Sequence, residues 1–153
     1  MRFLAFWLLL CLLAGTPFPS QSLTELTPVE ILCLRREGET VLAHCDGDLA
    51  ARGTSVQEAV ENLYAAAPGR LELGTVDFAV FTDLAPTPLL RDLGLRPAVT
   101  VCTAPPVENA DALAVYLRTH GGNVTLGALE ENPSLPVPRL TLGEMGLVAS
   151  ERK

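Results

Sequence analysis

Short runs of β-forming residues alternate with segments of helical periodicity from Val29 onward, and this alternation constrains the fold more than any other feature of the sequence. Two apolar runs, Val29–Leu34 and Thr40–Cys45, flank the polar stretch Arg35–Glu39. We predict that they form a hairpin in which Gly38 adopts a positive φ. The chain therefore begins its fold with an antiparallel strand pair.

The clearest helical pattern follows the hairpin, from about Ser55 to Ala67. Ser55 and Glu58 have the spacing of a capping box, and Pro68-Gly69 ends the pattern. Apolar residues recur at i, i+3, i+4, i+7 and i+11 along it: Val56, Ala59, Val60, Leu63 and Ala67. This spacing predicts an amphipathic helix that packs one face on the sheet.

The rest of the chain continues the alternation of strands and helices. The predicted elements are a strand, a short helix, a strand, a helix and a strand, over the ranges 71–81, 87–94, 98–103, 109–120 and 145–149. The range 71–81 is apolar on both alternating faces, which is typical of a central strand covered on both sides. The order β-β-α-β-α-β-α-β predicts an α/β (α+β) sandwich, with a mixed β-sheet and about three helices packed on it.

The N-terminal segment resembles a targeting signal. Arg2 precedes the apolar run Phe3–Gly15, and Pro17 and Pro19 follow it closely. We predict a signal peptide over 1–22, because a bilayer-spanning helix needs about 20 apolar residues. An N-terminal core helix and an uncleaved membrane anchor are the alternatives. Residues 23–153 would then form a single domain of roughly 130 residues, enough for one ordinary core.

The charge balance limits the classes of partner. Lys and Arg total 11, Asp and Glu total 18, and the formal net charge is −7. A chain this acidic carries no electrostatic footprint for nucleic acid or for an anionic membrane surface. We therefore predict no nucleic-acid partner.

Cysteine usage argues against a disulfide framework. Export permits disulfides, but removal of the signal leaves Cys33, Cys45 and Cys102, an odd number. Each lies in an apolar, strand-like stretch and is expected to be a small buried residue, although a Cys33–Cys45 bridge is possible. None of the cysteines has zinc-ligand spacing, so we predict no metal.

Few residues are candidates for catalysis or metal binding. His44 falls on a predicted strand, and His120 falls at a helix C-terminus, where it suits the helix dipole. Asp46-Gly47-Asp48 is interpreted as a turn, because the other ligand positions of a calcium loop are absent. The spacing of Cys102 and His120 does not support a nucleophile–base pair. We predict no catalytic site, no cofactor and no metal site.

The stretch Arg52–Ala85 resembles the N-terminal domain of the Ger(x)C family, the C subunits of bacterial spore germination receptors. The matching positions are Gly53, Ser55, Glu58, Ala59, Leu63, Pro68, Arg70, Leu71 and Gly74. Weaker matches follow at 89–92, 136–140 and 146–148. Gly53 and Gly74 permit tight turns or close approach of the backbone, and Ala59 and Leu63 would pack a helix on a sheet. The motif is therefore expected to mark a fold and not a catalytic site.

The resemblance implies a non-catalytic role in spore germination, at the outer face of the spore's inner membrane. The implied partners are the membrane-embedded subunits of a nutrient receptor. Two features depart from the family. Thr16 stands where the family has its lipid-carrying cysteine, so we predict no lipid anchor and membrane association through partners or an uncleaved signal. Family members also continue for two more domains, so we expect a stand-alone first domain or a truncated product.

Thr75 also follows Gly74 at a position where the family often has histidine. Two other functions are weighed against the family role. The first is an exported solute-binding or structural domain unrelated to germination, which a cavity with convergent polar groups would favour. The second is an exported hydrolase, which would need a nucleophile hydrogen-bonded to a base.

Overall fold

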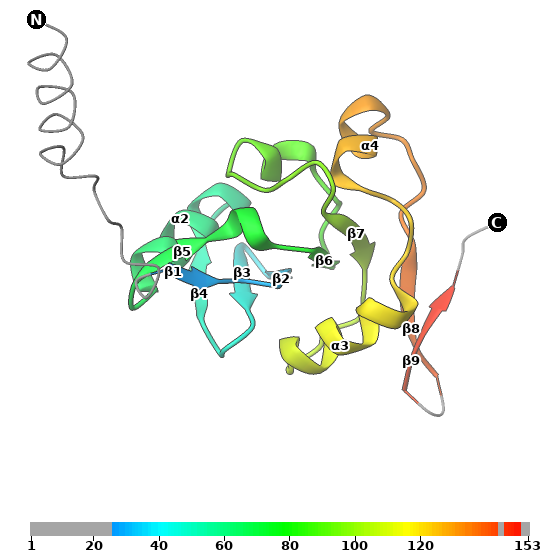
Figure 1. The fold of residues 1–153 in the computed structure, drawn as a ribbon, viewed down its shortest axis with the longest axis horizontal. Helices are drawn as coiled ribbons and strands as arrows, with labels where there is room; N and C mark the ends of the chain where they lie inside the picture. The colour runs from blue at the N-terminus through cyan, green and yellow to red at the C-terminus, as the bar shows by residue number, and fades with distance from the viewer. Residues whose placement is uncertain (1–25, 144–145, 151–153) are drawn as a thin grey trace, which may run out of the picture.

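The computed structural model describes residues 26–143 and 146–150, and a mixed seven-stranded sheet is its main feature (Figure 1). The strand order is β4-β3-β2-β6-β7-β8-β9, and β1 and β5 form a separate parallel pair. The strands are β1 Leu26–Pro28, β2 Ile31–Glu37, β3 Thr40–Cys45, β4 Ala50–Gly53, β5 Arg70–Glu72, β6 Phe78–Thr82, β7 Thr100–Thr103, β8 Arg139–Gly143 and β9 Gly146–Ser150. The helices are α2 Val56–Ala66, α3 Ala110–His120 and α4 Leu126–Glu131, with 3-10 turns η2 Leu73–Thr75 and η3 Pro88–Arg91.

Parallel strands form the centre of the sheet, and antiparallel hairpins extend both sides. β6 pairs in parallel with β2 and with β7, and all five of its residues are buried. β2–β3–β4 extend the sheet on one side, and β8–β9 extend it on the other. The predicted fold class, a mixed sheet with about three helices, is confirmed.

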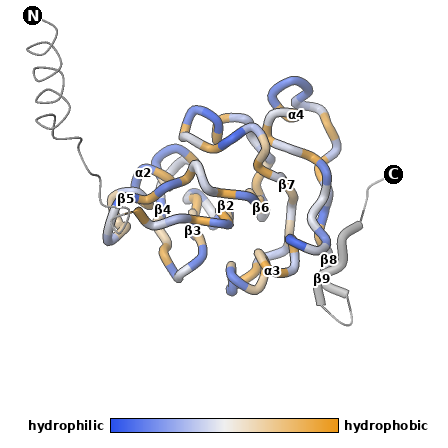
Figure 2. The backbone as a smooth tube through the Cα atoms, viewed as in Figure 1, coloured by the Kyte–Doolittle hydropathy of each residue, from blue (hydrophilic) through white to orange (hydrophobic). Residues whose placement is uncertain are grey.

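Helices pack on both faces of the sheet because its central strands are apolar on both faces. On β2, Leu32 and Leu34 belong to the core cluster that contains α2, whereas Ile31 and Cys33 belong to the cluster that contains α3. η3 and α4 contribute to the same cluster as α2. In Figure 2, hydrophobic residues recur along strands and helices, and hydrophilic residues occupy the loop beside α4.

The predicted helix at 55–67 is confirmed as α2, with a variation in its capping. The Ser55 hydroxyl oxygen accepts a hydrogen bond from the Glu58 backbone N–H at 3.1 Å, as a capping box requires. The Glu58 carboxylate does not return to Ser55. It accepts from the backbone N–H of Thr54 at 2.7 Å and from the Thr54 hydroxyl at 2.5 Å. These two hydrogen bonds lower the pKa of Glu58.

The predicted continuous strand 71–81 is wrong, because the chain turns within it. Residues 70–72 pair with β1 as β5, and residues 78–82 form β6 in the main sheet. Between them lies the 3-10 turn η2, in which the Gly74 N–H donates to a Glu72 carboxylate oxygen at 3.1 Å. The Thr75 hydroxyl also accepts from the Val29 N–H at 2.9 Å, which fixes this turn against the start of β2.

The C-terminal part contains more structure than we predicted. α4 follows α3 in a segment for which we predicted no element, and Thr125 caps it by accepting from the Ala128 N–H at 3.3 Å. β8 precedes the final strand, β9, and Met145, where we predicted that strand to begin, lies outside the described residues. β1 and β4 were likewise not predicted. All four elements are six residues or fewer, too short to show a clear periodicity.

The possible Cys33–Cys45 bridge is absent, because the three described cysteines are free and buried. The hairpin register places Cys33 opposite His44 and Leu32 opposite Cys45. Neighbouring positions along a strand point to opposite faces, so the two thiols lie on different sides of the sheet.

The predicted signal peptide 1–22, including Thr16, lies outside the described residues. Within residues 26–143 and 146–150, no helix is both long enough and apolar enough to cross a bilayer.

Candidate functional site

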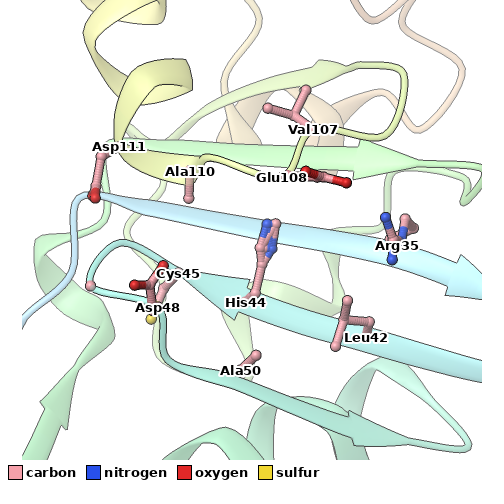
Figure 3. Close-up of a pocket in the computed structure, with 11 residues that line it drawn as sticks. Arg35, Leu42, His44, Cys45, Asp48, Ala50, Val107, Glu108, Ala110 and Asp111 are labelled. Atoms are coloured by element: carbon pink, nitrogen blue, oxygen red, sulfur yellow. The ribbon is translucent and has the colours of Figure 1, made fainter.

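A pocket of about 280 Å³ opens beside α3, on the face of the sheet that α3 covers (Figure 3). The buried residues clustered with α3 come from β2, β6, β7 and β8 and none from β3 or β4. Residues of β3 and β4 on this face are therefore not part of that core cluster, and they form the floor of the pocket. The lining residues are Arg35, Leu42, His44, Cys45, Gly47, Asp48, Ala50, Val107, Glu108, Ala110 and Asp111.

Strand register brings the floor of the pocket together. Leu42 and His44 alternate with residues of the α2-side core, and thus share the other face of β3. Ala50 of β4 lies opposite His44. The turn between β3 and β4 places Asp48 at one end, with Gly47 at φ 72° and Asp48 at φ 60°.

The opposite wall comes from the connection between β7 and α3. Val107 and Glu108 lie in this loop, and Asn109 caps α3 by accepting from the Ala112 N–H at 2.8 Å. Ala110 and Asp111 are the first residues of the helix. In Figure 3, Glu108 lies toward Arg35 and Asp111 lies toward Asp48, so this connection runs along the length of the pocket.

His44 is the polar group at the centre of this site. Its Nε2 atom is buried and has no hydrogen-bond partner among the described residues. Burial lowers the pKa of the imidazole, the Arg35 charge lowers it further, and Glu37 partly opposes them. The ring is therefore neutral at neutral pH, and it can donate or accept one hydrogen bond at each nitrogen according to its tautomer.

The basic side chain that lines the pocket is ion-paired, whereas the acidic ones are not. Arg35 forms an ion pair with Glu37, and the Arg52 Nε also lies 3.1 Å from a Glu37 oxygen. By contrast, Asp48, Glu108 and Asp111 form no ion pair with any described residue. The pocket is thus acidic at its lining, and its one guanidinium is held by a carboxylate of the chain itself.

A second cavity shares Arg35, His44 and Val107 with the pocket and also touches Cys33 and Thr82. Its volume is about 10 Å³, close to the space that one water molecule requires. It is too small for an organic ligand.

We expect the protein to lose stability as the pH falls through the range in which a free histidine titrates. The folded pKa of His44 lies below its unfolded value of 6.5, so the unfolded chain binds a proton more readily. The free energy of unfolding should therefore fall between about pH 7.5 and pH 5.5. Urea unfolding at both pH values measures this loss.

The variant His44→Gln removes the titrating group and should show a smaller loss of stability over the same interval. His120→Gln is the matched control, because that ring is exposed and stacks on Tyr116 at 4.5 Å. It should keep the His44-dependent loss. An equal pH slope in wild type and His44→Gln would contradict the burial of this imidazole.

The nine motif residues lie away from the pocket. They gather in β4, α2, β5, η2 and the connections between them: Gly53, Ser55, Glu58, Ala59, Leu63, Pro68, Arg70, Leu71 and Gly74. None of them lines the pocket. Ala59 and Leu63 are fully buried, and Pro68 follows the end of α2, so these positions have the structural roles expected of them.

The other residues considered from the sequence do not form a reactive site. Asp46 accepts from the Glu30 N–H at 3.1 Å, and the residues after it form a turn, as predicted. Burial raises the pKa of Cys102 to about 12, which keeps its thiol protonated. His120 contacts Tyr116 instead. Within the described part of the chain, no group of three or more His, Cys, Asp or Glu residues could hold a metal ion.

Sequence reasoning missed the pocket as a site. It singled out His44 and Asp48 separately, but not Arg35, Glu108 or Asp111. The only available signal was the alternation on Thr40–Cys45, which puts His44 and Leu42 on one face. Which loop would lie over that face depends on the tertiary arrangement.

The fold and the pocket together define an α+β domain with an acidic surface cavity. No family model, no curated protein and no solved structure matches this chain.

Proposed function

We propose that this chain is an exported, non-catalytic interaction domain related to the first domain of the Ger(x)C family. In this proposal it acts in spore germination, at the outer face of the spore's inner membrane. Its partners are the membrane-embedded subunits of a nutrient receptor, and protein contacts replace the lipid anchor that Thr16 does not permit.

The observation that carries the proposal is the packing of the family-like motif. A Cβ atom on Gly53 would lie 2.4 Å from the Ala59 backbone nitrogen, so only glycine lets β4 pass this close to α2. Ser55 caps that helix, and Leu71 is buried after it. These positions therefore form one structural unit, as expected if the motif describes a shared fold.

The chemistry of the described residues also supports a non-catalytic role. The three buried thiols have pKa values raised to about 12, chiefly by burial. Neither described histidine is hydrogen-bonded to a hydroxyl or thiol of the described residues. A nucleophile activated by a base requires such a contact.

Co-purification from dormant spores tests this proposal. The protein would be tagged at its C-terminus in its native host, and the spore membranes would be extracted with mild detergent. We expect the tagged chain to retain the two membrane subunits of a germinant receptor. The same tag on an unrelated exported protein is the control. Recovery only as a free soluble protein, or absence from spores, would overturn the proposal.

A second candidate function is an exported solute-binding domain unrelated to germination. The pocket favours it, because apolar side chains and several charged groups converge on one cavity. The two proposals differ in what they require. The first needs membrane partners, and the second needs a small ligand that binds the isolated protein.

A further inference from the structure

We propose that the pocket beside α3 binds a small organic cation, a protonated aliphatic amine, with its ammonium group at the end formed by Asp48 and Asp111. This inference rests on the solute-binding function above and names its ligand class. It does not depend on the receptor-subunit proposal.

The lining of the pocket carries more negative than positive charge. Three of the lining side chains are carboxylates, those of Asp48, Glu108 and Asp111, and the structure gives them no ion-pair partner among the described residues. The only guanidinium in the lining, on Arg35, is already paired with Glu37. Carboxylates that share a concave surface repel one another, and a bound cation relieves that repulsion.

The placement of the carboxylates is the second argument. In Figure 3, Asp48 and Asp111 lie on one side of His44, and Arg35 and Glu108 lie on the other. Asp111 is close enough to the carboxyl end of β3 to affect Cys45. The pKa of that thiol is raised to about 12 by burial first, and then by the carboxylates of Asp46 and Asp111. Two of the three lining carboxylates therefore lie at the end of the cavity away from Arg35.

The apolar lining distinguishes an organic cation from a metal ion. Leu42, Ala50, Val107 and Ala110 line the same cavity as the carboxylates. In the described residues, no three potential ligands are grouped closely enough to hold a metal ion. An aliphatic amine has both parts that this lining needs, because its hydrocarbon can cover the apolar side chains while its ammonium meets the carboxylates.

An anion is a poorer fit, although α3 directs its N-terminus to this cavity. Helix N-termini attract anions, but Asp111 occupies the first turn of α3 and offsets that positive end. Arg35 cannot present a free guanidinium without breaking its contact with Glu37. The whole chain also carries a net charge of −7, which repels an approaching anion.

Three probes of equal length and different charge test the proposal: n-butylammonium, butanol and butyrate. The protein is purified as the cell that produces it accumulates it. Binding is measured by NMR shifts of the Asp48, Asp111 and His44 amides. We expect n-butylammonium to bind at least about tenfold more tightly than butyrate or butanol. Its affinity should also decrease with added salt, because the residues that carry the carboxylates are exposed.

The double variant Asp48→Asn with Asp111→Asn should reduce the affinity for n-butylammonium about tenfold, to the level of butanol. Asparagine tolerates the positive φ of residue 48, which is 60°, so the turn should be kept. Glu131→Gln changes an exposed carboxylate on α4 and serves as the matched control. Circular dichroism establishes that each variant is folded.

The outcomes separate the ligand class from the function. If butyrate or butanol bound as tightly as n-butylammonium, the proposed preference for a cation would be wrong, but the pocket would still bind solutes. Unchanged n-butylammonium affinity in the double variant would overturn the site. No binding by any of the three probes would overturn both the cation site and the solute-binding function, while the receptor-subunit proposal would still be decided by co-purification.

Discussion

Replacing Gly53 with alanine should destabilise the protein by about 3 kcal/mol or more, because the new methyl group would overlap backbone atoms. Its Cβ would lie 2.4 Å from the Ala59 nitrogen and 2.7 Å from the Glu58 carbonyl carbon. Backbone atoms of a helix cannot rotate away as the end of a side chain can. β4 and α2 would therefore have to separate, which disrupts the closest contact between them.

The thermal unfolding midpoint measures this effect, and a loss of this size should lower it by roughly 10 °C. Gly38→Ala is the matched control, since nothing lies within 4 Å of its Cβ position. Its φ of 63° still disfavours alanine, so we expect a cost of about 1 kcal/mol there. If the two variants were equally stable, β4 would not pack on α2 as closely as the structure shows.

Truncation of Phe81 to alanine should cost about 3–5 kcal/mol, the usual range for removing a buried phenylalanine. Phe81 is 1% exposed and lies on the central strand β6, between Leu34 of β2 and Thr103 of β7. It belongs to the core cluster on the α2 side of the sheet. Neighbours on rigid strands can collapse only partly into the space that it leaves.

Such a loss is a large part of the 5–15 kcal/mol that typically stabilises a domain. Urea denaturation, with the midpoint and slope fitted separately, measures it. Leu89→Ala provides the comparison, because that side chain is 37% exposed and should cost under about 1 kcal/mol. A cost for Phe81→Ala as small as that for Leu89→Ala would place Phe81 outside the core.

Long periodic segments were the elements that the sequence predicted well. α2 and α3 each have eleven residues, a cap at the N-terminus and apolar positions on one face. The buried residues of α3, Ala110, Leu113, Ala114 and Leu117, recur at helical spacing. Local interactions between neighbouring residues specify such helices, so they can be recognised without knowledge of the rest of the fold.

The hairpin was predictable for the same reason. Two strands with β-forming residues meet at a short polar turn, and Gly38 takes the positive φ that the turn needs. The break between β5 and β6 was not predictable. The chain leaves the main sheet at residues 70–72 because β1 offers a separate partner there, and no local signal shows that pairing.

The sequence by itself determined the mixed α+β character, the two long helices and the burial of the three described cysteines, because each follows from local apolar patterning. The tertiary structure alone decided the pocket. Its walls join Arg35 and His44 of the hairpin to Glu108 and Asp111, which lie more than sixty residues later in the chain. Their meeting depends on β2, β6 and β7 lying side by side, a non-local pairing that no short segment encodes.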